Sequence, residues 1–360
     1  MFIADLHIHS RYSRATSASC NPACLDLAAR QKGLGLLAAG DFTHPAWREE
    51  LKTTLIPAEE GLYQLNRSLR LEDGGLREEA EPPRFIISGE ISTIYKQGER
   101  VRKVHHVILL PSLEAAEKLS LKLESLGCNL RSDGRPIIGL DSRDLLELTL
   151  DSCAEAIFIP AHIWTPHFSV LGAASGFSSI DDCYGDLTPH IHAVETGLSS
   201  DPPMNWRLSV LDRFTLVSNS DAHSPAKLAR EANIFHCALS YPAIAQALVK
   251  GNPGFGGTIE FFPEEGKYHL DGHRNCQVCL NPKETRALGG LCPVCGRKLT
   301  VGVLHRTEEL ADRPEDYRPT SALPYESLAP LAEVISGSYG WPVAGKKVAA
   351  LYSRLLAGLG

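Results

Sequence analysis

Short apolar runs alternate with polar loops and helical stretches over the first 262 residues of the chain. Continuous aliphatic and β-branched runs bounded by turns are typical of strands buried on both faces, as in a parallel sheet closed into a barrel. The pattern therefore predicts an α/β barrel. The predicted strands are residues 2–7, 34–41, 85–90, 104–110, 156–162, 193–196 and 214–221.

Helical patterns lie between and after these runs. Asn21 followed by Pro22 is typical of an N-cap with proline at the first helical position, and residues 113–126 predict a longer helix. Residues 346–359 place apolar side chains at helical spacing, which predicts an amphipathic closing helix.

The character of the sequence changes after Pro263. Residues 267–306 contain four of the ten cysteines and seven Lys or Arg against two acidic residues, a local net charge of +5. Residues 312–330 are proline-rich and typical of a loop. We therefore expect a barrel over residues 1–262, a cysteine module over 263–306, and a loop and helical segment over 307–360. Insertions in the barrel are expected at 55–81 and 127–142.

Composition limits the class of protein. With 43% hydrophobic and 22% charged residues among 360, the chain can bury a core and is expected to be globular. No secretory leader pattern or long apolar run is present, so we expect no membrane insertion and a reducing cytoplasm, where cysteines serve as thiols or metal ligands. The net charge of −7 argues against coating nucleic acid by bulk charge, but it leaves room for a local basic patch.

Histidine and acidic residues follow the predicted strands. His7 and His9 alternate along the end of the first strand, so both side chains share one face and can grip one metal ion. In barrels of this kind, functional groups come from the C-terminal ends of several strands. The further candidates are Asp41, His44, Glu90, His105, His106, His162, Asp221 and His223.

The cysteine module has the spacing of a zinc ribbon. Two C-x2-C pairs, Cys276 with Cys279 and Cys292 with Cys295, are separated by twelve residues and predict one tetrahedral Zn²⁺ held by four thiolates. Four protein ligands leave no open position for water, so this zinc is expected to be structural. A redox role would need a thioredoxin-like context, which is absent. Four thiolates around Zn²⁺ add −2 and leave a local charge near +3, which favours phosphate binding over a merely solvated surface.

The order of the barrel residues resembles the PHP (polymerase and histidinol phosphatase) superfamily of phosphoesterases. The resemblance implies a distorted seven-stranded (β/α) barrel with two to three catalytic ions, Zn²⁺, Mg²⁺ or Mn²⁺, and catalytic roles for Asp221, Glu90 and His9. The implied ligands of the first ion are His7, His9, Glu90 and Asp221, those of the second are Glu90, His106 and His162, and those of the third are His44 and His223 with Asp41.

Pattern alone leaves the choice between His105 and His106 open, because neighbours on a strand point to opposite faces. The resemblance favours His106, which directly precedes an apolar run. The third site departs from the superfamily pattern, since Ala15 stands where a histidine is common and Asp41 and His44 are separated rather than adjacent. We therefore rank it below the first two sites.

The whole chain resembles the endonuclease Q family, in which a PHP barrel is joined to a zinc ribbon. The resemblance implies a DNA repair endonuclease that hydrolyses the phosphodiester 5′ to deaminated bases (uracil, hypoxanthine, xanthine) and abasic sites in double-stranded or single-stranded DNA. It also implies 3′-hydroxyl and 5′-phosphate ends, and such an enzyme flips the damaged base out of the stack. The matching segments are residues 40–45, 132–136, 218–225, 303–306 and 310–314, together with the ribbon.

Basic and polar residues near the expected metal site are candidates for contacting DNA. A track of positive charge would lead a polyanion to the metals, and polar loops at strand ends would read the flipped base. The backbone candidates are Arg11, Arg14, Lys96, Arg100 and Arg102, and the base candidates are His167, Ser199, Asn219 and Ser220.

Two other functions fit parts of this pattern. A small-molecule phosphomonoesterase of the histidinol-phosphate type would share the barrel without needing a basic ribbon, and a non-catalytic DNA-binding module would need a broken metal cluster. A nuclease acting on chromosomal DNA is expected in the cytoplasm, associated with the nucleoid, with a replication or repair protein as a further partner.

Overall fold

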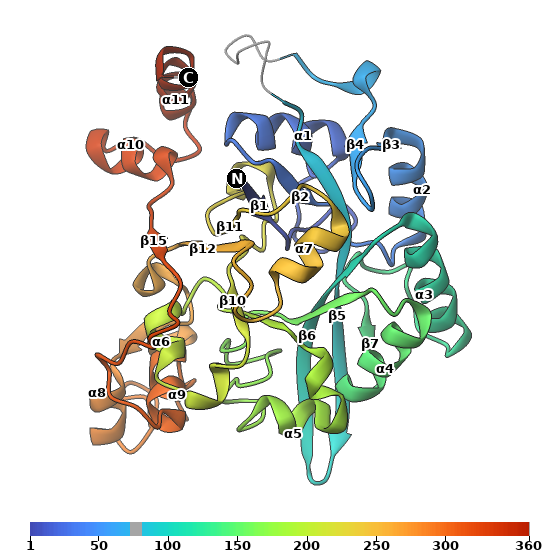
Figure 1. Cartoon of the computed structure of the whole chain (residues 1–360). Helices are drawn as coiled ribbons and strands as arrows, with labels where there is room; N and C mark the ends of the chain where they lie inside the picture. Colours follow the sequence, from blue (N-terminus) through green and yellow to red (C-terminus); the bar gives the residue numbers. More distant parts are fainter. Residues whose placement is uncertain (73–80, 360) are drawn as a thin grey trace.

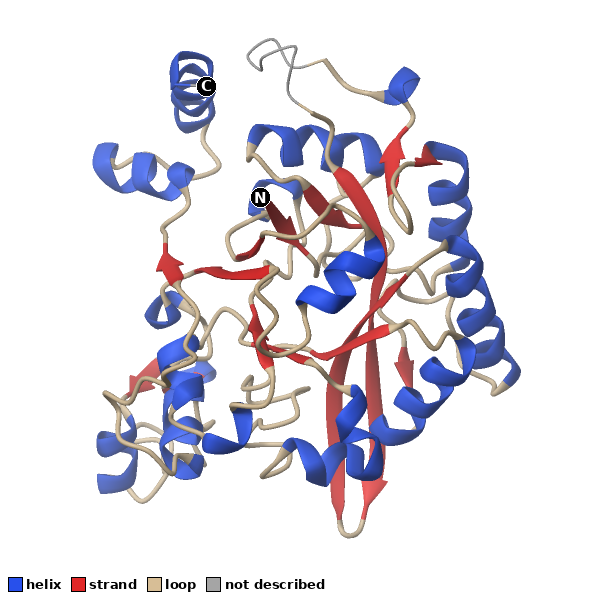
Figure 2. Ribbon diagram, viewed as in Figure 1, coloured by secondary structure: helices blue, strands red, loops and turns tan. Residues whose placement is uncertain are grey.

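The structure is a computed structural model that describes residues 1–72 and 81–359 (Figures 1 and 2). The strands are β1 (Phe2–Asp5), β2 (Leu36–Ala38), β3 (Leu55–Pro57), β4 (Tyr63–Leu65), β5 (Arg84–Gln97), β6 (Arg100–Leu110), β7 (Ile137–Ile138), β8 (Ile157–Pro160), β9 (Ala193–Glu195), β10 (Thr215–Val217), β11 (Ala232–Phe235), β12 (Phe255–Glu260), β13 (Asp271–His273), β14 (Val278–Leu280) and β15 (Tyr325–Ser327). The α-helices are α1 (Pro22–Gln31), α2 (Pro45–Thr54), α3 (Leu113–Ser125), α4 (Ser142–Ser152), α5 (Ile180–Tyr184), α6 (Pro202–Trp206), α7 (Tyr241–Ala247), α8 (Pro282–Ala287), α9 (Val303–Leu310), α10 (Leu331–Tyr339) and α11 (Lys346–Leu359).

The strands of the first part form a distorted barrel. β1, β2 and β5 are parallel neighbours, β6 runs antiparallel to β5, and β8 runs antiparallel to β6. The parallel pair β9 and β10 continues the ring, because β8 packs beside β9 and β10 packs beside β12. β12 returns to β1 through β11. Each of the seven predicted apolar runs contains one strand of this arrangement, which confirms the predicted α/β barrel. The sheet is mixed and not all parallel as expected, because β6 returns antiparallel to β5 and β8 antiparallel to β6.

A long hairpin distinguishes this barrel from a regular one. β5 and β6 pair continuously from Ile87 opposite Leu110 to Gln97 opposite Arg100, and their tips project beyond the rest of the barrel (Figure 1). Glu90 therefore lies within a strand, although we expected it at the end of one. The reason is that residues 91–97 continue the β pattern, with Ile91 and Tyr95 packed in the core.

Helices α2, α3 and α4 follow one another along one side of the barrel (Figure 1). The predicted cap of α1 is present, since the Asn21 side chain accepts a hydrogen bond from the Cys24 amide and Pro22 opens the helix. Buried side chains from these helices, such as Trp47 and Leu119, pack against strand residues such as Ile108. This apolar layer fixes the strands that carry the polar cluster described below.

The C-terminal part begins after β12. It contains the β13–β14 hairpin, helices α8 and α9, strand β15, and helices α10 and α11, the last with the predicted bounds of the closing helix. β15 lies within the stretch expected to be loop and pairs in parallel with the edge of β12, because that edge offers unpaired backbone groups. The division at residues 262 and 306 stays a prediction.

The expected insertion at 55–81 contains the antiparallel pair β3 and β4, and residues 73–80 of it lie outside the described residues. Within the described ranges, every helix is too short or too polar to traverse a lipid bilayer.

Candidate active site and zinc site

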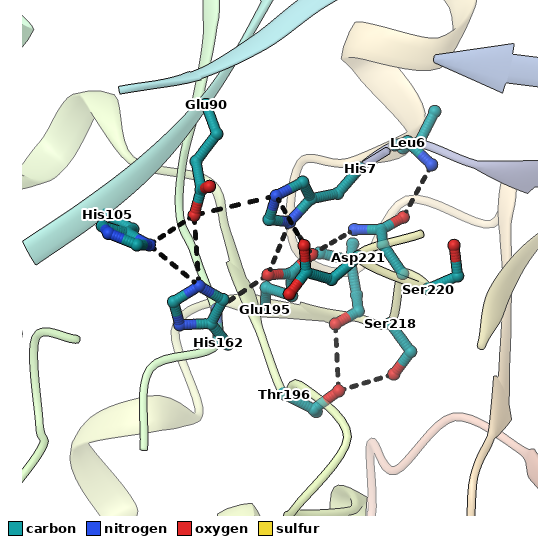
Figure 3. A network of polar contacts seen from close by, with 12 residues as sticks. Leu6, His7, Glu90, His105, His162, Glu195, Thr196, Ser218, Ser220 and Asp221 are labelled. Atoms are coloured by element: carbon teal, nitrogen blue, oxygen red, sulfur yellow. Dashed lines mark hydrogen bonds and ion pairs between the residues drawn. The ribbon is translucent and has the colours of Figure 1, made fainter. Parts of the chain in front are cut away.

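Glu90 of β5 stands at the centre of a buried cluster of histidines (Figure 3). Its carboxylate lies 2.6 Å from Nδ1 of His105 and 3.1 Å from Nε2 of His162. Nε2 of His7 and Nε2 of His9 are 3.7 Å and 3.4 Å away. Four separate segments, the end of β1, β5, β6 and the end of β8, thus direct ligand atoms to one point.

Asp221 closes the cluster on the side of β10. Its Oδ1 lies 3.0 Å from Nε2 of His9, 3.8 Å from Nε2 of His7 and 3.6 Å from Nδ1 of His223. Asp221 has a positive φ of 46°. The backbone therefore turns sharply after β10, which is an uncommon conformation for a residue other than glycine and is often found at functional sites.

Three overlapping groups in this cluster have ligand atoms within 4.8 Å of one another. Histidine nitrogen and carboxylate oxygen are the donors that Zn²⁺ and related divalent ions accept, and shared ligands such as Glu90 suit adjacent ions. The groups are His7 with His9 and Glu90, His9 with Asp221 and His223, and Glu90 with His105 and His162.

The environment of His7 shows most directly whether the cluster fits a metal ion. Its Nδ1 donates to the carboxylate of Glu195 at 3.0 Å, which directs Nε2 into the cluster. Nε2 is buried and has no hydrogen-bond partner within the described part of the chain. A histidine held by a carboxylate on one nitrogen and presenting the other to an acidic cluster is the usual arrangement of a metal ligand. The cluster therefore fits metal ions.

Neighbouring charges shift the groups of the cluster in different directions. Burial opposes protonation of His7 and His9, but the carboxylates beside them raise the pKa of both histidines well above the ordinary value, whereas Glu90 and His105 are shifted towards their metal-binding forms. Burial opposes ionisation of Glu90, but the neighbouring charges of His105, Arg135 and His7 lower its pKa well below the ordinary value. Burial lowers the pKa of His105 to about 4, although Glu90 opposes this shift. A carboxylate and a neutral imidazole are the forms that bind metals.

The structure corrects the preference for His106. On β6 the side chain of His105 points into the cluster, whereas His106 faces the opposite side of the strand. There His106 is fully buried, hydrogen-bonded to the hydroxyl groups of Tyr184 at 2.9 Å and Thr93 at 3.1 Å. Strand alternation allows only one of the two residues to reach the metals.

Asp41 and His44 are also placed differently from the prediction. Asp41 accepts hydrogen bonds from His9 Nδ1 at 3.0 Å, the Ser10 amide at 2.7 Å and the Ser13 hydroxyl at 2.8 Å, so it orients His9 rather than facing an ion. His44 donates through Nε2 to the Arg131 carbonyl and stacks on a tyrosine ring. Among the described residues, neither belongs to a group of candidate ligands.

Two functional candidates were missed by sequence reasoning. Glu195 ends β9, one of the predicted strands, and its position at a strand end was the available signal. Arg135 lies in the Ser-Asp-Gly-Arg-Pro segment at 132–136, and its Nη1 is 3.1 Å from Glu90. Gly134 fixes this segment, because a side chain there would collide with Asp41 and Ser13 at less than 3 Å.

The residues predicted to contact the DNA backbone lie in three different environments. Arg11 pairs with Glu50 at 2.7 Å, and Arg14 lies exposed beside Asp133. Lys96 and Arg100 are exposed near the tip of the β5–β6 hairpin. In contrast, the guanidinium of Arg102 lies 4.0 Å from the ring centre of a phenylalanine, so it has a packing role.

A cavity of about 480 Å³ adjoins the metal cluster. Predicted base-contacting residues Ser199 and Asn219 line it, together with the ligands His162 and Asp221. Asn219 also donates to Glu195 at 2.8 Å, so it supports the cluster as well. His167 is exposed and Ser220 is buried, and neither lines this cavity.

The cysteine module brings a histidine together with three of the four predicted cysteine ligands. His273, Cys276, Cys292 and Cys295 bring ligand atoms within 4.8 Å of one another. Cys279 is exposed and belongs to no such group within the described ranges. The cluster of Cys276, Cys292 and Cys295 is consistent with the predicted zinc ribbon.

Solved structures resemble the whole chain. The lesion-specific endonuclease PfuEndoQ from Pyrococcus furiosus is 31% identical and superimposes with a TM-score of 0.83, covering 100% of this chain and 83% of that one. Endonuclease Q in complex with a 27-mer duplex substrate with an abasic lesion at the active site is also 31% identical, with a TM-score of 0.85 and coverage of 100% and 84%.

Sequence relatives extend the comparison. YqxK of Bacillus subtilis is 29% identical over 331 residues, which cover 87% of this chain and 78% of YqxK. MJ0043 of Methanocaldococcus jannaschii is 33% identical over 192 residues, which cover 50% of this chain but only 23% of that protein. No protein-family model matches the chain.

Fold and site together define a hydrolase whose PHP-type barrel carries a cluster of metal ligands and is followed by a zinc ribbon. The extent and identity of the match to PfuEndoQ show that the chain belongs to the endonuclease Q family. It is thus placed among the metal-dependent nucleases.

Proposed function

We propose that this protein nicks DNA on the 5′ side of deaminated bases and abasic sites, and that it selects the lesion by taking the nucleotide out of the stack. The observation that carries the proposal is the cavity of about 480 Å³ that shares His162 and Asp221 with the metal cluster. A nucleotide held in this cavity would place its phosphate beside the cluster. The endonuclease Q complex with an abasic duplex supports DNA as the substrate.

The chain's own residues have distinct parts in this reaction. His7, His9, Glu90, His105, His162, Asp221 and His223 would hold two to three divalent ions. Such ions supply an activated water near neutral pH and neutralise charge on the phosphate. Glu195 and Asp41 fix the rings of His7 and His9, so the ligand nitrogens are positioned before substrate arrives.

Base selection would fall to the polar wall of the cavity. Thr165, Ser199 and the backbone around Gly197 lie along it, with Lys267 and Tyr268 on the ribbon side. Hydroxyl and backbone groups can hydrogen-bond the Watson–Crick edge of a flipped base, while an aromatic ring can stack on it. Uracil, hypoxanthine and xanthine, which differ from the undamaged bases at that edge, are the proposed substrates.

Arg135 is proposed to hold the scissile phosphate. Its guanidinium is partly exposed at the mouth of the cluster, and its planar set of N–H donors can bind two phosphate oxygens at once. We expect Arg135→Ala to reduce single-turnover nicking on the order of a hundredfold, as when one donor to a charged transition state is removed. Arg135→Lys should keep part of the activity. Arg213→Ala, which removes a guanidinium paired with Asp181 on the surface, is the matched control.

The measurements for Arg135 are the nicking rate at saturating protein, DNA affinity by fluorescence anisotropy and metal content per chain. A rate unchanged by Arg135→Ala would refute the assigned role. A loss that merely parallels loss of metal would assign Arg135 to the stability of the cluster instead.

The proposed function is tested with matched duplexes. Each carries one uracil, one hypoxanthine, one abasic site or no lesion in the same sequence, and the purified chain is supplied with Mg²⁺, Mn²⁺ or Zn²⁺. We expect a single nick 5′ to each lesion, with a 3′-hydroxyl that a polymerase extends and a 5′-phosphate that a ligase seals. Equal cleavage of the undamaged duplex, or none of any duplex, would reject lesion-specific nicking.

The same preparations distinguish the rival function. Hydrolysis of a chromogenic phosphomonoester together with indifference to all duplexes would favour a small-molecule phosphatase. A cytoplasmic, nucleoid-associated location and a replication or repair partner stay proposals that follow from DNA as the substrate.

A further inference from the structure

We propose that the ribbon zinc is held by one histidine and three cysteines, His273, Cys276, Cys292 and Cys295, and that Cys279 is not a ligand. The sequence pattern favours two C-x2-C pairs. The structure instead pairs His273 with Cys276 at the same x2 spacing, three residues earlier in the chain.

Distances within the group suit tetrahedral zinc. The four ligand atoms lie within 4.8 Å of one another, and Sγ of Cys295 is 3.4 Å from Nδ1 of His273. Zinc–sulfur and zinc–nitrogen bonds of ordinary length at a tetrahedral angle would separate these two atoms by about 3.6 Å. The distance between these two atoms is therefore close to that of a tetrahedral zinc site.

The two halves of the site have the same backbone form. Cys292 and Cys295 are followed by Gly296, with φ of 69°, and the residue after Cys276 is Gln277, with φ of 53°. Left-handed backbone is uncommon for a residue such as glutamine. Its presence at the position equivalent to Gly296 indicates that the chain makes the same ligand turn at both places.

Strand pairing aligns the two turns residue by residue. Leu291 pairs with Lys298 across the second turn, and Gly272 pairs with Cys279 across the first. An offset of 19 residues therefore superimposes both pairs, and it places Cys279 at the position of Lys298. Lys298 forms the isolated bridge that closes the turn and lies beyond the last ligand, Cys295. Cys279 occupies that same place and therefore lies outside the first ligand turn.

The ligand set changes the charge of the ribbon. Residues 267–306 have seven basic and two acidic residues, a net of +5. Three thiolates around Zn²⁺ add −1, giving +4, whereas four thiolates would add −2 and give +3. A histidine ligand thus leaves the module more attractive to a phosphate backbone.

The test uses the full chain and three variants. Zinc bound through thiolates is counted by its release on treatment with an organomercurial, which separates it from ions in the barrel. We expect one such zinc in the parent chain and in Cys279→Ser, and its loss in His273→Ala and in the control Cys276→Ser. Loss in Cys279→Ser with retention in His273→Ala would overturn the proposal, as would retention in both.

A second measurement covers the case in which both His273→Ala and Cys279→Ser misfold and lose zinc. The unmodified parent protein is treated briefly with N-ethylmaleimide, and the labelled cysteines are located by mass spectrometry. We expect rapid labelling of Cys279, with Cys276, Cys292 and Cys295 protected until zinc is removed. Protection of Cys279 equal to that of the other three would show that it binds the ion.

Discussion

Replacing Asp221 with Asn is expected to reduce nicking by at least about a thousandfold, which corresponds to about 4 kcal/mol of transition-state stabilisation. Asp221 contacts both His9 and His7 and belongs to the group that includes His223. Burial opposes its ionisation, but its hydrogen bond with His9 and the charges of both histidines lower its pKa. Asparagine keeps the size of the side chain and removes the charge that a metal ion needs.

The Asp221→Asn variant should still bind lesion-containing DNA, because the cavity and the basic residues are unchanged. Nicking is measured under single-turnover conditions and binding by anisotropy with the same duplex. Asp186→Asn is the matched control, since Asp186 is exposed and pairs with Arg143 on the surface. Activity close to that of the parent chain in Asp221→Asn would refute the metal cluster as the catalytic centre.

Replacing His105 with Asn is expected to abolish nicking to a similar degree and to remove about one ion per chain. His105 and His162 share Glu90 in one group, so loss of one ring nitrogen leaves that ion with too few protein ligands. In His106→Asn, activity per folded molecule should change by no more than a few fold. That variant should instead lose stability, by about 1–3 kcal/mol, because the hydrogen bonds to Tyr184 and Thr93 are buried.

The pair of adjacent histidines thus gives an internal control. Metal content is measured by inductively coupled plasma mass spectrometry and stability by thermal unfolding. Nicking is assayed at a temperature at which both variants are folded. The reverse result, with activity lost in His106→Asn and kept in His105→Asn, would show that the ligand set inferred from the resemblance holds and the one inferred from the structure does not.

The sequence predicts the strands of this barrel well because each is a short apolar run bounded by turns. It predicts His7, His9, Glu90, His162, Asp221 and His223 as members of one cluster for the same reason, since each follows or lies in such a run. The hairpin was not predicted. Residues 91–97 carry a strand pattern beyond Glu90, and a pattern alone does not say whether the next strand returns antiparallel.

Other differences come from information that a linear pattern lacks. His105 and His106 differ only in the face of β6 that each occupies, and that face depends on pairing with β5. Asp41 has a side chain able to bind a metal or to orient a ligand, and the four hydrogen-bond donors around it decide between these roles. Cys279 has ligand chemistry and ligand spacing, but backbone geometry assigns the turn to His273 and Cys276.

Because β5 and β6 pair continuously, the length of their hairpin and the position of the metal ligands on it are independent of each other. Glu90 and His105 lie on opposite strands of the hairpin, so their relative position depends on register and not on how far the tip extends. Deleting two successive facing pairs, Lys96 with Val101 and Gln97 with Arg100, would shorten the hairpin, keep the hydrogen-bond type of the pair that closes the turn and leave both ligands in place. Deleting one residue between Glu90 and His105 would turn His106 toward the metals instead. The length of this arm can therefore be redesigned in steps of two facing pairs without altering the metal site.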